Sequence, residues 1–166
     1  EARQKLAADP ASWMLPTGED RRAPFEVTDN GDVFWVSKAS GSTGVDLDVH
    51  LKKYSTEGVE RWSKTFLSTG HEDVMATATD RSDPMNPKLY VLGSFNDQLD
   101  FGPAGILQSN GSFDYFVLKL DANGVPLWAK SFGGSGDESL GADIAVHGAS
   151  VYVNGSFEHS VTFGGS

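Results

Sequence analysis

Internal repetition restricts what this chain can fold into more than any other feature of the sequence. Residues 48–76 align with residues 114–142 at a constant offset of 66, with ten identities in 29 positions. Each copy carries a tryptophan in a similar setting, Glu-Arg-Trp-Ser-Lys-Thr-Phe around Trp62 and Pro-Leu-Trp-Ala-Lys-Ser-Phe around Trp128. A repeat of this length predicts similar structural units that stack on their neighbours.

The repeat continues beyond this segment at a smaller offset. Residues 89–95 align with residues 151–157 at an offset of 62, and Phe101-Gly102 aligns with Phe163-Gly164. The extra residues of the first copy lie within residues 81–88, which contain two prolines and are typical of a longer turn. A weaker copy begins upstream, where residues 27–36 follow the same plan. Each unit is therefore expected to contain four strands, with the tryptophan on the fourth.

The local patterns favour strands over helices. Residues 114–121 are rich in aromatic and branched side chains and are followed by Asn123-Gly124, a strong signal for a tight hairpin turn. The partner strand is expected at 125–132, and the earlier copy at 49–54 and 59–66. Small residues such as Ala76 and Ala78 in the first strands are typical of strands that converge near a crowded axis. The sequence predicts an all-β fold, a β-propeller with four-stranded antiparallel blades, and leaves a β-sandwich as the alternative.

The blades can be placed along the chain. Residues 1–24 are expected to form a polar lead-in segment, followed by blades at 25–67 and 72–133 and a half blade at 140–166. About two and a half blades make an incomplete ring, because propellers contain roughly four to eight. We therefore expect the chain to be a segment of a longer polypeptide or to be completed by other chains.

The repeat unit resembles a known bacterial family. The sequence from Gly111 to Gly124, then Trp128, residues 132–137, residues 144–146, residues 151–157 and Phe163-Gly164 is similar to the bacterial β-propeller repeat called SBBP. This resemblance covers residues 25–166 and is best in 46–164. It departs in the first copy, where Leu67-Ser68-Thr69 stands in place of Gly-Gly-Ser. The resemblance implies a propeller in a secreted or cell-surface protein and carries no catalytic motif.

Composition excludes several classes of function. The formal net charge is −10, which disfavours nucleic acid and anionic membranes as partners. The chain has no cysteine, no apolar run long enough to span a membrane, and four histidines without the spacing of a zinc site. We assign no catalytic, cofactor or metal residues. A weak calcium candidate at Asp46 and Asp48, with Asp114 at the matching place in the next copy, competes with side chains that cap their own turns.

Recurring carboxylates are the remaining catalytic candidates. Glu57, Glu60, Glu72 and Glu138 recur partly with the repeat. A glycoside hydrolase needs a pair of carboxylates that flank one bond. Residues that recur with a structural repeat are better explained by the fold, so no such pair is assigned.

Two further sets of residues have expected roles. The structural blade core is expected to include Trp62, Trp128, Tyr90, Tyr152, Phe66 and Phe132, and replacing either tryptophan by alanine would then cost roughly 3 to 5 kcal/mol. The long loop at 96–112 carries Phe101, Ile106 and Leu107, which are candidates for a binding loop. The alternative is that this loop folds back and covers the blade edge.

These observations favour a non-catalytic extracellular, cell-surface or periplasmic module of bacterial origin. It is expected to act as a protein-interaction or structural scaffold, with other propeller blades or protein subunits as partners. A glycan-binding propeller is the alternative, and a propeller hydrolase ranks third.

Overall fold

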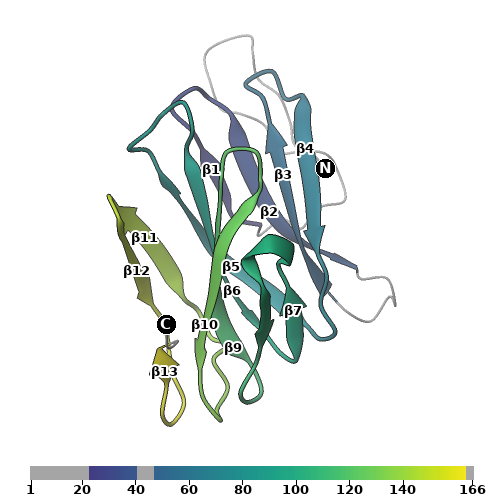
Figure 1. The fold of residues 1–166 in the computed structure, drawn as a ribbon, viewed down its shortest axis with the longest axis vertical. Helices are drawn as coiled ribbons and strands as arrows, with labels where there is room; N and C mark the ends of the chain where they lie inside the picture. Colours follow the sequence, from purple (N-terminus) through teal and green to yellow (C-terminus); the bar gives the residue numbers. More distant parts are fainter. Residues whose placement is uncertain (1–22, 41–46, 164–166) are drawn as a thin grey trace.

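Figure 1 shows the fold in a computed structural model, which describes residues 23–40 and 47–163. Most of the expected lead-in, 1–24, and Asp46 lie outside the described residues. The described chain is almost entirely antiparallel β-structure, with one short 3-10 helix, η1 (Gly102–Ala104). The prediction of an all-β chain with antiparallel sheets is confirmed.

The described strands form two large sheets and two small ones, one of which, within residues 96–112, is described below. Sheet 1 follows the chain order, with β1 (Phe25–Val27), β2 (Val33–Ser40), β3 (Leu47–Tyr54) and β4 (Glu60–Phe66). Sheet 2 repeats this plan with β5 (Glu72–Asp80), β6 (Lys88–Phe95), β9 (Asp114–Leu120) and β10 (Pro126–Gly133), and β13 (Thr162–Phe163) adds to its edge. Sheet 3 is the hairpin of β11 (Asp143–His147) and β12 (Ser150–Asn154).

Sheets 1 and 2 match in register as well as in strand order. Lys53 lies opposite Trp62 in the β3–β4 pair, and Lys119 lies opposite Trp128 in the β9–β10 pair. An irregularity in the ladder occurs beside the tryptophan in both sheets. The tryptophan-bearing strands therefore pair as the sequence predicts.

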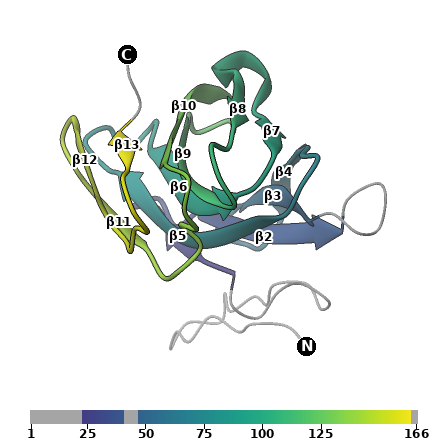
Figure 2. The same ribbon diagram turned by 90° about the horizontal axis from the view of Figure 1, so that it is seen from below.

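Hydrophobic packing occurs on both faces of sheet 2. One cluster joins residues of sheet 1, including Phe34 and Leu51, to residues of sheet 2, including Val91 and Phe116. A second cluster joins Tyr90 and Val117 on the opposite face to Ile144 of sheet 3. Figure 2 shows sheet 2 between sheets 1 and 3. Sheets 1, 2 and 3 are thus stacked face to face in sequence order.

The segment at 96–112, expected to be a loop, forms a short hairpin of β7 (Gln98–Asp100) and β8 (Ile106–Gln108). β7 also lies along the chain that leaves sheet 1, because the Asp100 amide donates to the Leu67 carbonyl at 3.0 Å. β13 makes the same kind of contact with the end of β10. Each unit therefore contacts the outer strand of the unit before it.

The repeat extends to an unusual backbone conformation. Asp97 and His159 both have φ of 62°. They occupy equivalent positions, because each is the second residue after its aligned segment, 89–95 or 151–157. A left-handed conformation is uncommon for residues other than glycine. Its recurrence shows that the connection after the second strand has one geometry in both units.

Candidate functional site

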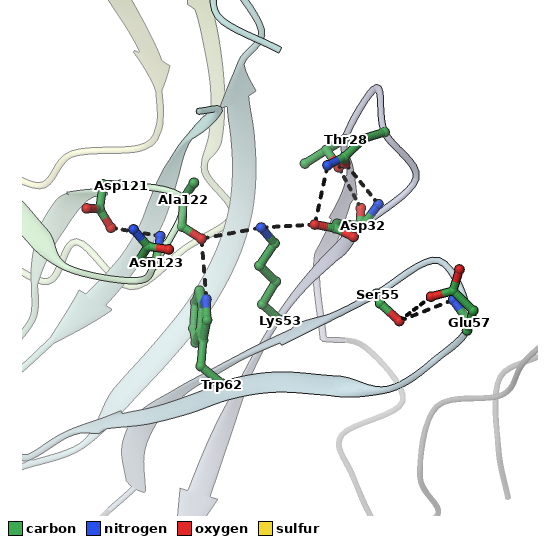
Figure 3. A network of polar contacts seen from close by, with 10 residues as sticks. Thr28, Asp32, Lys53, Ser55, Glu57, Trp62, Asp121, Ala122 and Asn123 are labelled. Atoms are coloured by element: carbon green, nitrogen blue, oxygen red, sulfur yellow. Dashed lines mark hydrogen bonds and ion pairs between the residues drawn. The ribbon is translucent and has the colours of Figure 1, made fainter. Parts of the chain in front are cut away.

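The most specific polar contact between sheets 1 and 2 centres on one backbone carbonyl. Ala122 lies in the turn between β9 and β10, and its carbonyl accepts hydrogen bonds from Trp62 Nε1 at 3.3 Å and Lys53 Nζ at 3.4 Å. Figure 3 shows both donors of sheet 1 meeting this oxygen. We call this contact, formed by Lys53, Trp62 and Ala122, the Ala122 joint.

Lys53 is held in place by further contacts within sheet 1. Its Nζ forms an ion pair with Asp32 Oδ2 at 3.0 Å and lies 5.2 Å from the centre of the Phe34 ring. The side chains of Lys53 and Asp32 are only 12% and 17% exposed. Since a buried ammonium needs compensating partners, the carboxylate, the ring and the carbonyl together stabilise the charge.

The turn that supplies the acceptor is fixed by its own side chain. Asp121 Oδ1 accepts hydrogen bonds from the backbone amides of Asn123 at 2.9 Å and Val125 at 2.8 Å. Gly124 has φ of +74°, and a Cβ there would lie 2.8 Å from Trp62 Cη2. Only glycine therefore lets the turn lie this close to the indole. The aspartate acts as a turn cap, as the sequence predicts for residues 121–124.

Sheet 2 carries the same donors at equivalent positions. Lys119 Nζ lies 5.0 Å from the centre of the Tyr90 ring, and the rings of Tyr90 and Trp128 are 6.0 Å apart. In sheet 1 the corresponding rings, Phe34 and Trp62, are 5.9 Å apart. Within the described part of the chain, no acceptor pairs with Trp128 Nε1, and Lys119 forms no close ion pair. The pKa of the Asp80 carboxyl is nevertheless lowered by a hydrogen bond from the Ser82 amide and, to a smaller extent, by the charge of Lys119.

The residues expected in the blade core have different degrees of burial. Tyr90 and Phe66 are buried, at 1% and 8% exposure. Trp62, Trp128 and Phe132 are half-buried rather than fully buried, and each packs against the rim of a cluster. Tyr152 differs from the expectation, because it is 59% exposed. Tyr90, its equivalent in sheet 2, is covered by sheet 3, whereas no described sheet covers Tyr152.

The three residues expected to form a binding loop differ in how deeply they are buried. Phe101 is fully buried, with its ring 5.2 Å from Phe66 and 5.4 Å from Phe116. Leu107 is half-buried against the same cluster. Ile106 is 57% exposed. Only Ile106 thus presents most of its side chain to a ligand, and the rest of the hairpin covers the edge between sheets 1 and 2.

Two surface hollows border this hairpin. A polar cavity of about 560 Å³ is lined by residues that include His71, Asn96, Asp97, Gln108 and Asn110. A more apolar groove of about 430 Å³ follows the seam between β4 and the start of β10, and its lining includes Phe66, Leu67 and Pro103. Among the described residues that line the polar cavity, His71 is the only one with an aromatic ring.

Two of the four recurring glutamates, Glu72 and Glu138, bond to the connections between sheets, whereas Glu57 lies in the turn between β3 and β4 and Glu60 begins β4. Glu72 is 2% exposed and its Oε2 accepts a hydrogen bond from the Ser68 hydroxyl at 2.5 Å. Glu138 is fully buried and its Oε2 accepts from the Gly134 amide at 3.2 Å. These contacts join equivalent positions in the two units. Each glutamate is thus hydrogen-bonded to the segment that joins its unit to the one before it.

Asp46, one half of the calcium candidate, lies outside the described residues, and Asp48 and Asp114 occupy matching places in sheets 1 and 2. Asp48 Oδ1 accepts a hydrogen bond from the Ser68 amide at 3.1 Å, and Asp114 Oδ2 accepts from the Asn110 amide at 3.2 Å. Burial raises the pKa of the Asp114 carboxyl, and the hydrogen bonds from Asn110 partly oppose this rise. Among the described residues, no three histidine or carboxylate side chains gather in a metal-binding arrangement.

The search for a membrane-spanning helix gave a negative result: none of the described residues form a helix with the length and apolar character to cross a bilayer.

Comparison with protein-family models found no match. Comparison with curated proteins likewise found none. The resemblance to bacterial propeller repeats therefore depends on the residues quoted for it.

Proposed function

We propose that the chain is a non-catalytic β-propeller module that acts as a protein-interaction or structural scaffold. One observation carries this proposal: sheets 1 and 2 share the same order of four strands and pack face to face, and sheet 3 packs on the far face of sheet 2. Units that contact only their neighbours are typical of repeat scaffolds. Further blades would come from other parts of a longer polypeptide or from other subunits.

The packing of sheet 2 favours a propeller over a two-layer sandwich. A sandwich has one core between two inner faces. Here sheet 2 has separate hydrophobic clusters on its two faces. Blades in a propeller are packed on both faces in this way.

Two of the four recurring glutamates are buried, which favours a scaffold over a hydrolase at these positions, whereas Glu57 and Glu60 are exposed. Glu72 and Glu138 are almost fully buried and bonded to their own connections. A glycosidase pair would face a common cleft within about 10 Å. The net charge of −10 and the resemblance to secreted repeats support an extracellular or cell-surface scaffold that binds proteins and not nucleic acids.

The mass of the protein in its native setting tests this proposal. Sedimentation of material isolated without denaturation is expected to give a particle heavier than the 17.8 kDa of this chain, either as a longer polypeptide or as an assembly. A monodisperse 17.8 kDa monomer with a single cooperative unfolding transition would contradict the incomplete-propeller proposal.

The polar cavity beside the β7–β8 hairpin favours a second function, glycan binding. Its amide, carboxylate and hydroxyl groups suit the hydroxyls of a sugar. A glycan array, screened with and without calcium, tests this alternative. Binding that is lost in an Asn96→Ala, Gln108→Ala variant would support it, and an array without hits in both conditions would remove it.

A further inference from the structure

The Trp128 face of sheet 2 carries a lysine and a tryptophan at the positions that Lys53 and Trp62 hold in sheet 1. We propose that it binds the outer hairpin of a further unit of the same repeat: two antiparallel strands joined by a tight turn of the Asp-x-Asn-Gly type. The carbonyl at the second turn position would accept hydrogen bonds from Trp128 Nε1 and Lys119 Nζ, and the hairpin would pair with the open edge of β12. This inference rests on the proposed function and names the contact by which the next unit is held.

The first argument is the match between the two donor sets. The ring-to-ring distances are 5.9 Å for Phe34 and Trp62 and 6.0 Å for Tyr90 and Trp128. The ammonium-to-ring distances are 5.2 Å in sheet 1 and 5.0 Å in sheet 2. The lysine and tryptophan are cross-strand partners in both sheets. Sheet 2 therefore holds its lysine and indole at nearly the same distances from the neighbouring ring as sheet 1 does, with the two rings inclined at 68° instead of 47°.

The second argument is the place of sheet 3. Its two strands pack on the same face of sheet 2 as Tyr90 and Trp128, as continuation of the stack requires. By sequence alignment β12 corresponds to β6, the second strand of its unit. In sheet 2 the third and fourth strands follow the second in space and carry the turn with Ala122. The corresponding strands of sheet 3 would bring their turn to Trp128.

The third argument is the strand edge itself. β12 pairs with β11 on one side, and no strand in the described part of the chain pairs with its other side. Unpaired amide and carbonyl groups on an edge readily accept an added strand. A partner with free backbone groups suits this combination of an indole donor, an ammonium and a strand edge. In the contact between sheets 1 and 2, the corresponding donors bind the carbonyl of a hairpin turn.

An extended chain tests the docking site directly. The alignment places Ser166 opposite Ala104, so a copy of residues 105–133 joined after Ser166 supplies the third and fourth strands of the unit. Phenylalanine replaces the tryptophan of the appended copy, so that the four native indole N–H signals remain resolved in ¹⁵N NMR spectra. We expect the Trp128 indole proton to shift and its exchange with water to slow by about tenfold.

Trp62 is the matched control, because its indole is already bonded to Ala122 and should not change. An extension of the same composition in scrambled order should leave Trp128 unchanged. In the extended chain, Trp128→Phe should remove part of the gain in the thermal midpoint that the extension produces. An extension that folds elsewhere, or stays unfolded, with Trp128 exchange unchanged would overturn the inference.

Two outcomes separate this inference from the proposed function. A heavy native particle together with an unchanged Trp128 in the extended chain would reject the docking site and keep the scaffold. Protection of Trp128 in the unextended chain that grows with protein concentration would show that a second copy fills the site, and would overturn the proposed occupant.

Discussion

At the residue scale, the contact between sheets depends on a backbone atom that a glycine makes accessible. Gly124 combines φ of +74° with an approach that leaves no room for a Cβ beside Trp62 and Lys64. A methyl group at this position has to displace the turn or the indole. The Ala122 carbonyl would then move away from its two donors.

Gly124→Ala is expected to lower the free energy of unfolding by more than about 2 kcal/mol, because left-handed strain and a steric clash add together. Urea unfolding measures the loss. Gly148→Ala is the control, since Gly148 has φ of +56° with no atom near its missing Cβ. That variant should lose about 1 kcal/mol from strain alone. Equal losses in the two variants would show that the turn does not press on Trp62.

The buried Asp114 predicts a pH dependence of stability. Its folded-state pKa is raised by burial, so the folded protein holds the proton more tightly than the unfolded chain does. Its contribution is largest below the unfolded pKa of about 3.9 and is lost as the pH rises through the folded pKa. Asp114→Asn removes this loss, so the variant should gain stability relative to the wild type as the pH rises from about 4.

Asp80 provides a control of opposite sign. A hydrogen bond from the Ser82 amide lowers the pKa of the Asp80 carboxyl, so its contribution is present above the unfolded pKa and is lost as the pH falls through the folded one. Asp80→Asn should therefore lose stability relative to the wild type as the pH rises over the same range. Unfolding curves at several pH values compare the two, and parallel trends would contradict one of the two assignments.

At the scale of single elements, the β7–β8 hairpin is a cover with one exposed point. Phe101→Ala is expected to cost about 3 to 5 kcal/mol, because the ring is fully buried against Phe66 and Phe116. Ile106→Ala should change stability by no more than about 0.5 kcal/mol, because its side chain is largely exposed. Thermal or urea unfolding of the two variants checks this contrast. A large loss in Ile106→Ala would mean that the hairpin buries that side chain in solution.

The elements that sequence predicts best are the long strands with clear turns. Asn123-Gly124 and the aromatic and branched residues before it predicted the β9–β10 hairpin, because turn chemistry and strand composition are local signals. The β7–β8 hairpin was missed, since three-residue strands interrupted by Gly102 and Pro103 leave too short a pattern.

The candidate site was predicted less completely, for a different reason. Its donors, Lys53 and Trp62, recur visibly in the sequence as Lys119 and Trp128. Its acceptor is a carbonyl, which every residue possesses, so no side chain marks Ala122. The exposure of Tyr152 depends on which sheets lie beside it and is not encoded in its own segment.

At the scale of the whole molecule, stability is expected to vary from one sheet to the next. β6 and β9 lie inside sheet 2 and between two hydrophobic clusters, so their amides should exchange with solvent most slowly. β11 and β12 form a two-stranded sheet packed on one face, and such hairpins are marginal alone. Amide exchange followed by NMR checks this order. Equal protection of sheets 2 and 3 would show that the molecule opens only as a single unit.

The distance along the chain between Trp62 and its acceptor has a consequence for synthesis. The indole and the Ala122 carbonyl are separated by 60 residues. At a ribosomal rate of roughly 5 to 20 residues per second, the acceptor emerges about 3 to 12 seconds after the tryptophan. Sheet 1 therefore lacks its hydrogen bonds to Ala122 until the turn between β9 and β10 has been translated.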